Sequence, residues 1–237
     1  MVPAAFGLVG SNVDWIETAF VIVLLVISLG VHEAAHAWSA WKLGDSTAKD
    51  MGRMTLNPLV HIDPFMSIIL PALCAITGAP IFGGAKPVPV NFNRLRNPWP
   101  DMGIVAFAGP LSNLLLACLF FALFKLFVLT GFYNDAAYTA LARENDLLPR
   151  IMMKSMQYNV LLFVFNLIPI PPLDGSRIMA NALPLSVREN YVRIGGFGLV
   201  LVFMLINYVR PFQVLVFSVL DKVEDLVKNI VTLGNRW

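Results

Sequence analysis

The sequence has 237 residues, of which 57% are hydrophobic and only 14% are charged, and its mean hydropathy is +0.71. A soluble domain of this length normally has about a quarter charged residues, so the composition argues against a soluble protein and indicates a membrane protein. The formal net charge of +2 and the lack of a Lys/Arg cluster argue against nucleic acid as a partner.

The first predicted membrane span runs from about Trp15 to Leu43, with Gly44 as its stop. A helix of this length exceeds a hydrocarbon core of ~30 Å, so we expect its polar C-terminal part near the interface. A secretory signal is not expected, because the first Lys or Arg anywhere is Lys42. Positive residues follow this span (Lys42, Lys49 and Arg53) and none precedes it, so the positive-inside rule predicts that its far end is cytoplasmic.

Two unusual segments follow. Phe65 to Gly78 is apolar but short and contains Pro71, so it is either a short span or a re-entrant segment. Gly83 to Asn97 is rich in Gly and Pro and is not expected to be helical.

The remaining apolar segments predict further membrane helices. Met102 to Thr130 is the clearest second span, with Gly109-Pro110 and Asn113 expected near its start. Met156 to Ile168 leads into a Pro-rich break, Pro169 to Pro172. Later helices are expected over Arg193–Tyr208, flexed by its glycines, and over Pro211–Leu233, whose charged last part leaves the membrane or lies on its surface.

These segments together predict the fold class. We expect an all-α polytopic membrane protein, a bundle of about 5–6 transmembrane or re-entrant helices with a short extended Gly/Pro-rich segment. One membrane-embedded domain accounts for residues 1–237.

A metal-binding motif lies in the first span, where residues 32 to 36 read His32-Glu33-Ala34-Ala35-His36. On a helix, positions i and i+4 share a face, so both imidazoles can point at one ion. Glu33 can reach a water on that ion without being a ligand, and zinc lowers the pKa of bound water towards ~7. Ionisable groups in a membrane span are costly, which favours a functional site over residues that merely lie at the interface.

The third ligand of a catalytic zinc is left open by this pattern. Such a site has three protein ligands and an open fourth position. The chain has three histidines and two poorly placed cysteines, so the third ligand is His61 or a carboxylate. Asp174 is the candidate carboxylate, although an aspartate before a glycine is also a common turn pattern.

A second motif, Asn166-Leu-Ile-Pro169-Ile-Pro-Pro-Leu-Asp174-Gly175, resembles its counterpart in the site-2 protease family of intramembrane zinc metalloproteases, which pairs it with H-E-x-x-H on another span. The segments around Gly109-Pro110 and from Thr55 to Pro64 also resemble bacterial members. The resemblance extends from about residue 28 to 180, and no PDZ-like domain is seen.

The resemblance implies particular roles for these residues. The zinc ligands would be His32, His36 and Asp174, and Glu33 would be the general base. Asn166 would stabilise the site or the oxyanion through its amide, and an interfacial or supporting role is favoured for His61 over ligation. For Asn113 the resemblance leaves two alternatives open, a supporting role at the site or a helix-packing amide in the bundle.

The substrate implied by the resemblance is a membrane-spanning protein or peptide in the lipid bilayer. Its helix must unwind before cleavage, because a helix hides its amides in hydrogen bonds. In an extended segment Pro87 and Pro89 point one way, which leaves the edge with Val88 and Val90 for strand addition. A polyproline-like surface loop is the alternative.

Two other functions remain open at this point. A zinc channel or transporter would use the same ligands on a passing ion, but Glu33 would then be superfluous. A catalytically silent membrane scaffold would not need an intact base and ligand set. The sequence therefore favours an intramembrane zinc metalloendopeptidase in the cell membrane, with its zinc site towards the cytoplasmic side.

Overall fold

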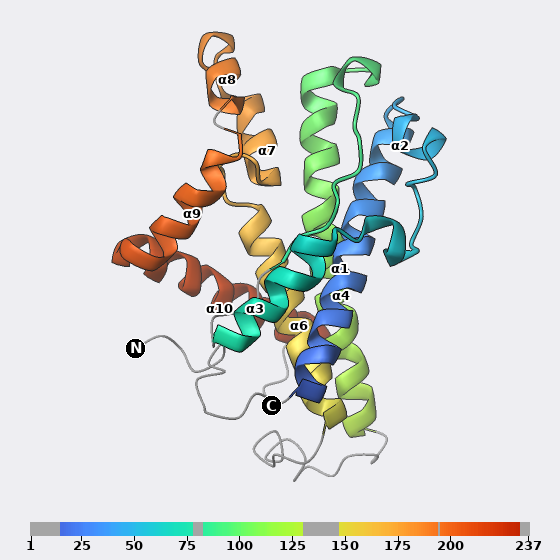
Figure 1. The fold of residues 1–237 in the computed structure, drawn as a ribbon, viewed down its shortest axis with the longest axis vertical. Coiled ribbons are helices and arrows are strands. Elements are labelled where there is room, and N and C mark those ends of the chain that lie inside the picture. The colour runs from blue at the N-terminus through green and yellow to red at the C-terminus, as the bar shows by residue number, and fades with distance from the viewer. Residues whose placement is uncertain (1–14, 78–82, 130–146, 194, 233–237) are drawn as a thin grey trace.

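The computed structural model describes residues 15–77, 83–129, 147–193 and 195–232, and the regular structure within these ranges is entirely helical. Figure 1 shows three long helices side by side at the centre, α1 (Trp15–Lys42), α4 (Pro98–Leu129) and α6 (Leu147–Asn166). The all-α prediction is therefore confirmed for the described part of the chain. The shorter elements are α2 (Thr47–Asp50), η2 (Pro58–His61), η3 (Pro64–Ile69), α3 (Leu70–Thr77), η4 (Phe92–Arg94), α7 (Asp174–Ala182), α8 (Leu185–Val192), α9 (Phe197–Tyr208) and α10 (Arg210–Thr232).

Helices α1 and α4 are the two in the described ranges that are long and apolar enough to cross a membrane. Their 28 and 32 residues correspond to about 42 and 48 Å, more than the ~30 Å hydrocarbon core. The predicted end of the first span is confirmed to within one residue, because α1 ends at Lys42 and the predicted stop, Gly44, has a φ of 112°. Glycine adopts this left-handed conformation without the steric cost that other residues meet.

Helix α4 begins earlier than predicted. The expected start was Met102, but the helix begins at Pro98, so Gly109-Pro110 lies in its interior rather than near its start. Proline is favoured in the first turn, where its missing N–H is not needed. The carboxylate of Asp101 also accepts a hydrogen bond from the backbone N–H of Asn97 at 2.7 Å, which satisfies a donor at the helix start. Helix α6 likewise begins before the predicted Met156.

The short apolar segment predicted over 65–78 is helical but too short to cross a membrane. The π-helical η3 continues directly into α3, and its apolar part ends at Ile76. Thirteen residues of helix cover only about 20 Å. This length favours the re-entrant alternative, and the predicted end at Gly78 lies outside the described residues.

The predicted span over Arg193–Tyr208 is interrupted. Helix α8 ends at Val192, Gly195 has a φ of 53°, and α9 begins only at Phe197. The predicted start of this span at Arg193 was therefore wrong, and its glycines shorten it, as predicted. Helix α9 has 12 residues, or about 18 Å, which is shorter than a hydrocarbon core.

Helix α10 has a buried face and a charged face. Val216 and Leu220 pack into the interior, whereas Asp221, Lys222 and Asp225 are exposed. Such a distribution suits a helix lying along a membrane surface or leaving it, as the sequence predicted for this segment. The last predicted residue, Leu233, lies outside the described residues.

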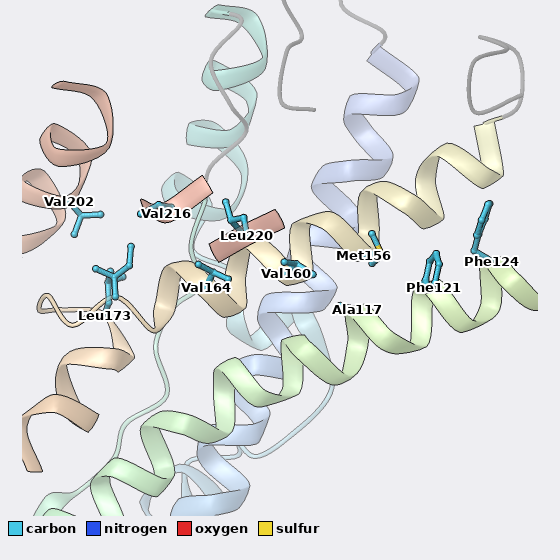
Figure 2. Packing of buried hydrophobic residues seen from close by; sticks show 11 residues of the cluster. Ala117, Phe121, Phe124, Met156, Val160, Val164, Leu173, Val202, Val216 and Leu220 are labelled. Carbon is cyan, nitrogen blue, oxygen red and sulfur yellow. The ribbon is translucent and has the colours of Figure 1, made fainter. Parts of the chain in front are cut away.

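The main apolar cluster joins α4 and α6 to the C-terminal helices (Figure 2). Phe121 of α4 and Met156 and Val160 of α6 are buried in it, together with Val216 and Leu220 of α10. Burying each such side chain contributes roughly 1.5–3 kcal/mol when the alternative is water. The cluster holds α6 firmly against α4, and the end of α6 leads to the candidate site.

Candidate metal centre

His32 and His36 lie one helical turn apart on α1 and point to the same side. Their ring centroids are 4.6 Å apart and nearly perpendicular, at 86°. The two Nε2 atoms are 3.0 Å apart, and the residues are only 4% and 7% exposed. The spacing of four residues thus brings both imidazoles together, as the motif predicted.

Asp174 completes this group from a distant part of the chain. It is the first residue of α7, and its Oδ2 lies 3.1 Å from His32 Nε2 and 3.3 Å from His36 Nε2. The backbone of Gly175 packs closely against the backbone of Leu167 and Ile168, and this contact positions Asp174. A Cβ atom at Gly175 would lie 2.7 Å from the carbonyl oxygen of Ile168 and closer still to that of Leu167. Only glycine lets the start of α7 pack so tightly on the end of α6.

The hydrogen bonds of the two rings determine which nitrogens carry protons. His32 Nδ1 donates to Asn113 Oδ1 at 2.6 Å, and His36 Nδ1 donates to the carbonyl oxygen of Val105 at 2.7 Å. Both of these oxygen atoms can only accept hydrogen bonds, so the neutral rings present unprotonated Nε2 atoms. Two imidazole lone pairs and a carboxylate oxygen therefore face one another, and a cation is the partner that satisfies all three.

Zinc fits this donor set. His and carboxylate ligands bind zinc at about 2.0–2.2 Å in tetrahedral geometry, which separates ligand atoms by about 3.3–3.6 Å. The observed separations of 3.0 and 3.1 Å are only slightly shorter, and that of 3.3 Å falls within this range. Three protein ligands also leave the open fourth position of a catalytic site.

Gly109 gives this centre its space on the α4 side. A Cβ atom at this position would lie 2.6 Å from His32 Nε2 and even nearer to His36 Nε2. Contacts this short do not occur, so any other residue would displace the rings. The glycine of the Gly109-Pro110 motif is therefore needed to leave room for the two imidazole rings.

Glu33 is buried beside the histidines, and its carboxylate is held by the extended arm, residues 83–91. Its Oε2 accepts a hydrogen bond of 2.6 Å from the backbone N–H of Val88, and both residues are 9% exposed. The arm contains no strand in its described residues. The Val88 N–H that the sequence offered for strand addition is therefore already bonded to the predicted base.

A cavity of about 260 Å³ connects these groups. Its walls include the two histidines, Glu33 and Asp174, parts of the arm, and Asn166 and Arg177. The Asn166 amide donates one hydrogen bond to the carbonyl oxygen of Leu162, 3.0 Å away. Asn166 thus lies at the cavity, and its role in stabilising the site or the oxyanion stays a prediction.

His61 lies apart from this group. It is 1% exposed, and its Nε2 bonds to the carbonyl oxygen of Thr55 at 3.0 Å. The cluster of possible metal ligands in the described residues contains His32, His36 and Asp174 but not His61. The alternative of His61 as third ligand is therefore not favoured, and its interfacial or supporting role stays a prediction.

Comparison with known proteins identifies the family. Residues 20–155 match the model of Peptidase family M50. YwhC of Bacillus subtilis, described as a candidate zinc metalloprotease, is 38% identical over 192 residues, which cover 81% of each chain. The chain belongs to peptidase family M50. The resemblance to site-2 proteases is thereby confirmed, and this M50 peptidase is a zinc metalloprotease.

Other relatives carry the same description. Rip2 of Mycolicibacterium smegmatis is 34% identical over 159 residues, covering 66% of this chain and 55% of the relative. Rip2 of Mycobacterium tuberculosis is 29% identical over 209 residues, covering 86% and 73%. No solved structure matches the chain.

Sequence reasoning missed several residues around the centre of this M50 peptidase. It left Asn113 undecided, and the structure places its amide against His32. It overlooked Arg177, the one Lys or Arg among the described residues that line the cavity. It also overlooked Asn159, which donates to Ser28 Oγ and bonds to Asn113. A polar amide inside an apolar helix was the available signal for Asn159.

Proposed function

We propose that this M50 peptidase is an intramembrane endopeptidase that hydrolyses peptide bonds in or near transmembrane segments of membrane proteins, as in regulated intramembrane proteolysis. The observation that carries the proposal is the convergence of His32, His36 and Asp174 within 3.3 Å, beside two helices long and apolar enough to cross a membrane. These residues are the proposed zinc ligands, and residues 1–237 are proposed to form a single membrane-embedded domain.

The proposed chemistry uses two more side chains. Zinc bound to this centre would act as a Lewis acid and lower the pKa of a bound water towards ~7. Glu33 accepts the proton of the attacking water and returns it to the leaving amine. Asn166 has a second amide hydrogen beyond its bond to Leu162, and this hydrogen is a donor for the developing oxyanion.

The arm is the proposed site where an unwound substrate pairs. In an extended segment the amides of Val88 and Val90 lie on the same edge, and Val88 N–H points at Glu33, so this edge faces the cavity. Both residues line the cavity, and Val90 N–H has no hydrogen-bond partner among the described residues. A substrate added to this edge would pass directly beside the base.

The proposed location is the cell membrane, with the metal centre towards the cytoplasm. The ammonium of Lys42 lies 4.7 Å and that of Lys49 4.5 Å from the ring of Trp41, a combination typical of a membrane interface. Arg96 N–H donates to the carbonyl oxygen of Leu43, and Arg94 pairs with Asp50 on α2 at 3.8 Å. The tertiary structure therefore brings Arg94 and Arg96 to the same end of α1 as Lys42 and Lys49, which supports the positive-inside argument.

Two alternative functions make different predictions. A zinc transporter would need its ligands but not Glu33, and a silent scaffold would need neither. Glu33 lines the same cavity as the ligands and is held there by Val88. This placement favours hydrolysis, in which a carboxylate beside the metal has a task.

The test compares Glu33→Gln with the wild-type protein in reconstituted vesicles, using a transmembrane peptide as substrate and metal analysis of the purified protein. We expect Glu33→Gln to keep zinc and to lose cleavage by about 10²- to 10⁴-fold. His32→Ala is the control that should lose both. Unchanged cleavage in Glu33→Gln would contradict the proposed mechanism, and zinc flux that persists in the variant would favour the transporter.

A further inference from the structure

A chain of buried polar side chains leads from α6 to the proposed zinc ligand His32. Asn159 of α6 and Asn113 of α4 are both 0% exposed, and Ser28 of α1 is 2% exposed. All three lie where the three central helices meet. Buried amides of this kind are costly unless every hydrogen bond is made, so their arrangement needs a reason.

Each link of this chain has a fixed direction. The carbonyl oxygen of Ser155 can only accept, so the amide nitrogen of Asn159 faces it at 2.8 Å. The Oδ1 of Asn159 must then face Asn113, whose amide nitrogen donates to it at 3.0 Å. This leaves the Oδ1 of Asn113 to accept from His32 Nδ1 at 2.6 Å. A backbone carbonyl of α6 thus determines, through two amides, that Nδ1 of His32 carries the proton.

We propose that Asn159 is a positioning residue that selects the metal-binding tautomer of His32. Without its Oδ1, the amide of Asn113 can turn over and present its NH₂ group to Nδ1. His32 would then carry its proton on Nε2, the atom that faces Asp174 and His36, and could not bind an ion there. The proposal rests on the proposed ligand role of His32.

The two proposed histidine ligands differ in this respect. His36 Nδ1 bonds to the backbone carbonyl of Val105, which lies in a helix and cannot turn over. His32 depends on a side-chain amide, whose two ends have nearly the same shape but opposite hydrogen-bonding character. The amide therefore needs a further partner to fix its orientation, and Asn159 is that partner.

The contacts of Ser28 allow the expected effects to be ranked. The carbonyl oxygen of Ser28 lies 3.4 Å from the Asn113 amide nitrogen, which is longer than an ordinary hydrogen bond, so it is only a weak substitute for Asn159. The Ser28 hydroxyl accepts from the Asn159 amide at 2.9 Å, but the Ser155 carbonyl remains when this hydroxyl is removed. Ser28→Ala should therefore have a much smaller effect than Asn159→Leu.

The first measurement is the zinc affinity of purified protein in detergent, by competition with a chelator. We expect Asn159→Leu to bind zinc about 10- to 100-fold more weakly, the usual effect of losing an outer partner of a metal ligand. Nitrogen NMR of histidine-labelled, metal-free protein should show His32 shifting from the Nδ1–H towards the Nε2–H tautomer. Thr18→Val, which removes another buried polar group of α1, is the matched control and should keep its affinity.

A rescue variant separates this role from packing. A carboxylate has no donor, so Asn113→Asp presents an acceptor to His32 Nδ1 in either orientation. Asn113→Asp combined with Asn159→Leu should recover zinc affinity to within a few-fold of wild type. Unfolding temperature, measured on every variant, identifies any that fail to fold.

Two results would overturn the inference. One is an unchanged zinc affinity and tautomer in a folded Asn159→Leu variant. The other is a loss of affinity that Asn113→Asp does not restore, because that outcome would mean a packing role. Failure of the proposed ligand role is distinguishable, since His32→Ala would then bind zinc as tightly as the wild-type protein. Failure of the proposed function is distinguishable too, since it would appear as unchanged cleavage in Glu33→Gln and would leave the zinc affinities of the Asn159 variants as expected.

Discussion

The cavity has two walls that are built in different ways. One wall consists of α1, α4, α6 and α7. Helices α1 and α7 supply the proposed zinc ligands, which are held by buried hydrogen bonds within the helical bundle. The other wall is the arm, which has no regular secondary structure and is held by individual hydrogen bonds to other segments of the chain. Lys86 N–H donates to the His61 carbonyl, and Asn91 N–H donates to Asp45 Oδ2.

The difference separates two tasks of the proposed enzyme. Metal binding depends on helices that cannot shift without disturbing the bundle, whereas the proposed base Glu33 takes its orientation from Val88 of the arm. Changes in the helical wall should therefore affect zinc affinity, and changes in the arm should affect turnover while leaving zinc in place.

The largest expected effect is at Gly109 in the helical wall. In Gly109→Ala the added methyl would displace the imidazoles, so we expect zinc affinity to fall by more than the ~100-fold typical of outer partners. The helix should remain intact, because alanine is favoured over glycine in helices by about 1 kcal/mol. Gly103→Ala is the matched control on the same helix, because its Cβ would meet only the movable amide end of Asn181. Unaltered zinc binding in Gly109→Ala would disprove the close packing described here.

A smaller effect on turnover is expected at Val88 in the arm. Val88→Pro removes the N–H that holds Glu33, so we expect cleavage to fall by about 10- to 100-fold while zinc content stays unchanged. Val90→Pro is the companion variant, because it removes an edge donor without touching Glu33. If cleavage falls only in Val88→Pro, the arm serves the base alone, and a fall in both supports strand addition.

The smallest expected effect is at Arg53, which ties the arm to the rest of the chain. Its guanidinium donates to the carbonyl oxygens of Lys86 at 2.8 Å and Pro87 at 2.9 Å. Arg53→Gln should lower kcat/KM by about 3- to 10-fold, since hydrogen bonds to a charged group contribute roughly 1.5–3 kcal/mol when well made and less when exposed. Arg53→Lys should recover only part of this loss, because an ammonium lacks the planar pair of donors. A fall in zinc affinity instead would contradict the separation of the two walls.

Much of the fold and of the candidate site was predictable from local patterns. The apolar run ending at Lys42 determined α1, and the four-residue spacing put His32 and His36 on one face. Errors occurred where local signals compete. The first turn of α4, Pro98 to Asp101, contains two prolines and an aspartate and precedes the apolar run, so the start predicted at Met102 came too late. The glycines around Gly195 divide a helix that hydropathy alone would continue.

The sequence by itself determined the membrane class, the first span, the histidine pair and the neighbouring carboxylate of Glu33, because each depends on residues close together in the chain. Only the tertiary structure placed Asp174 rather than His61 beside the histidine pair, gave Asn113 its contact with His32 and brought Val88 to Glu33. Those contacts join residues separated by 55 to 142 positions. Which of these distant residues come into contact is decided by how the helices pack, and no local pattern contains that information.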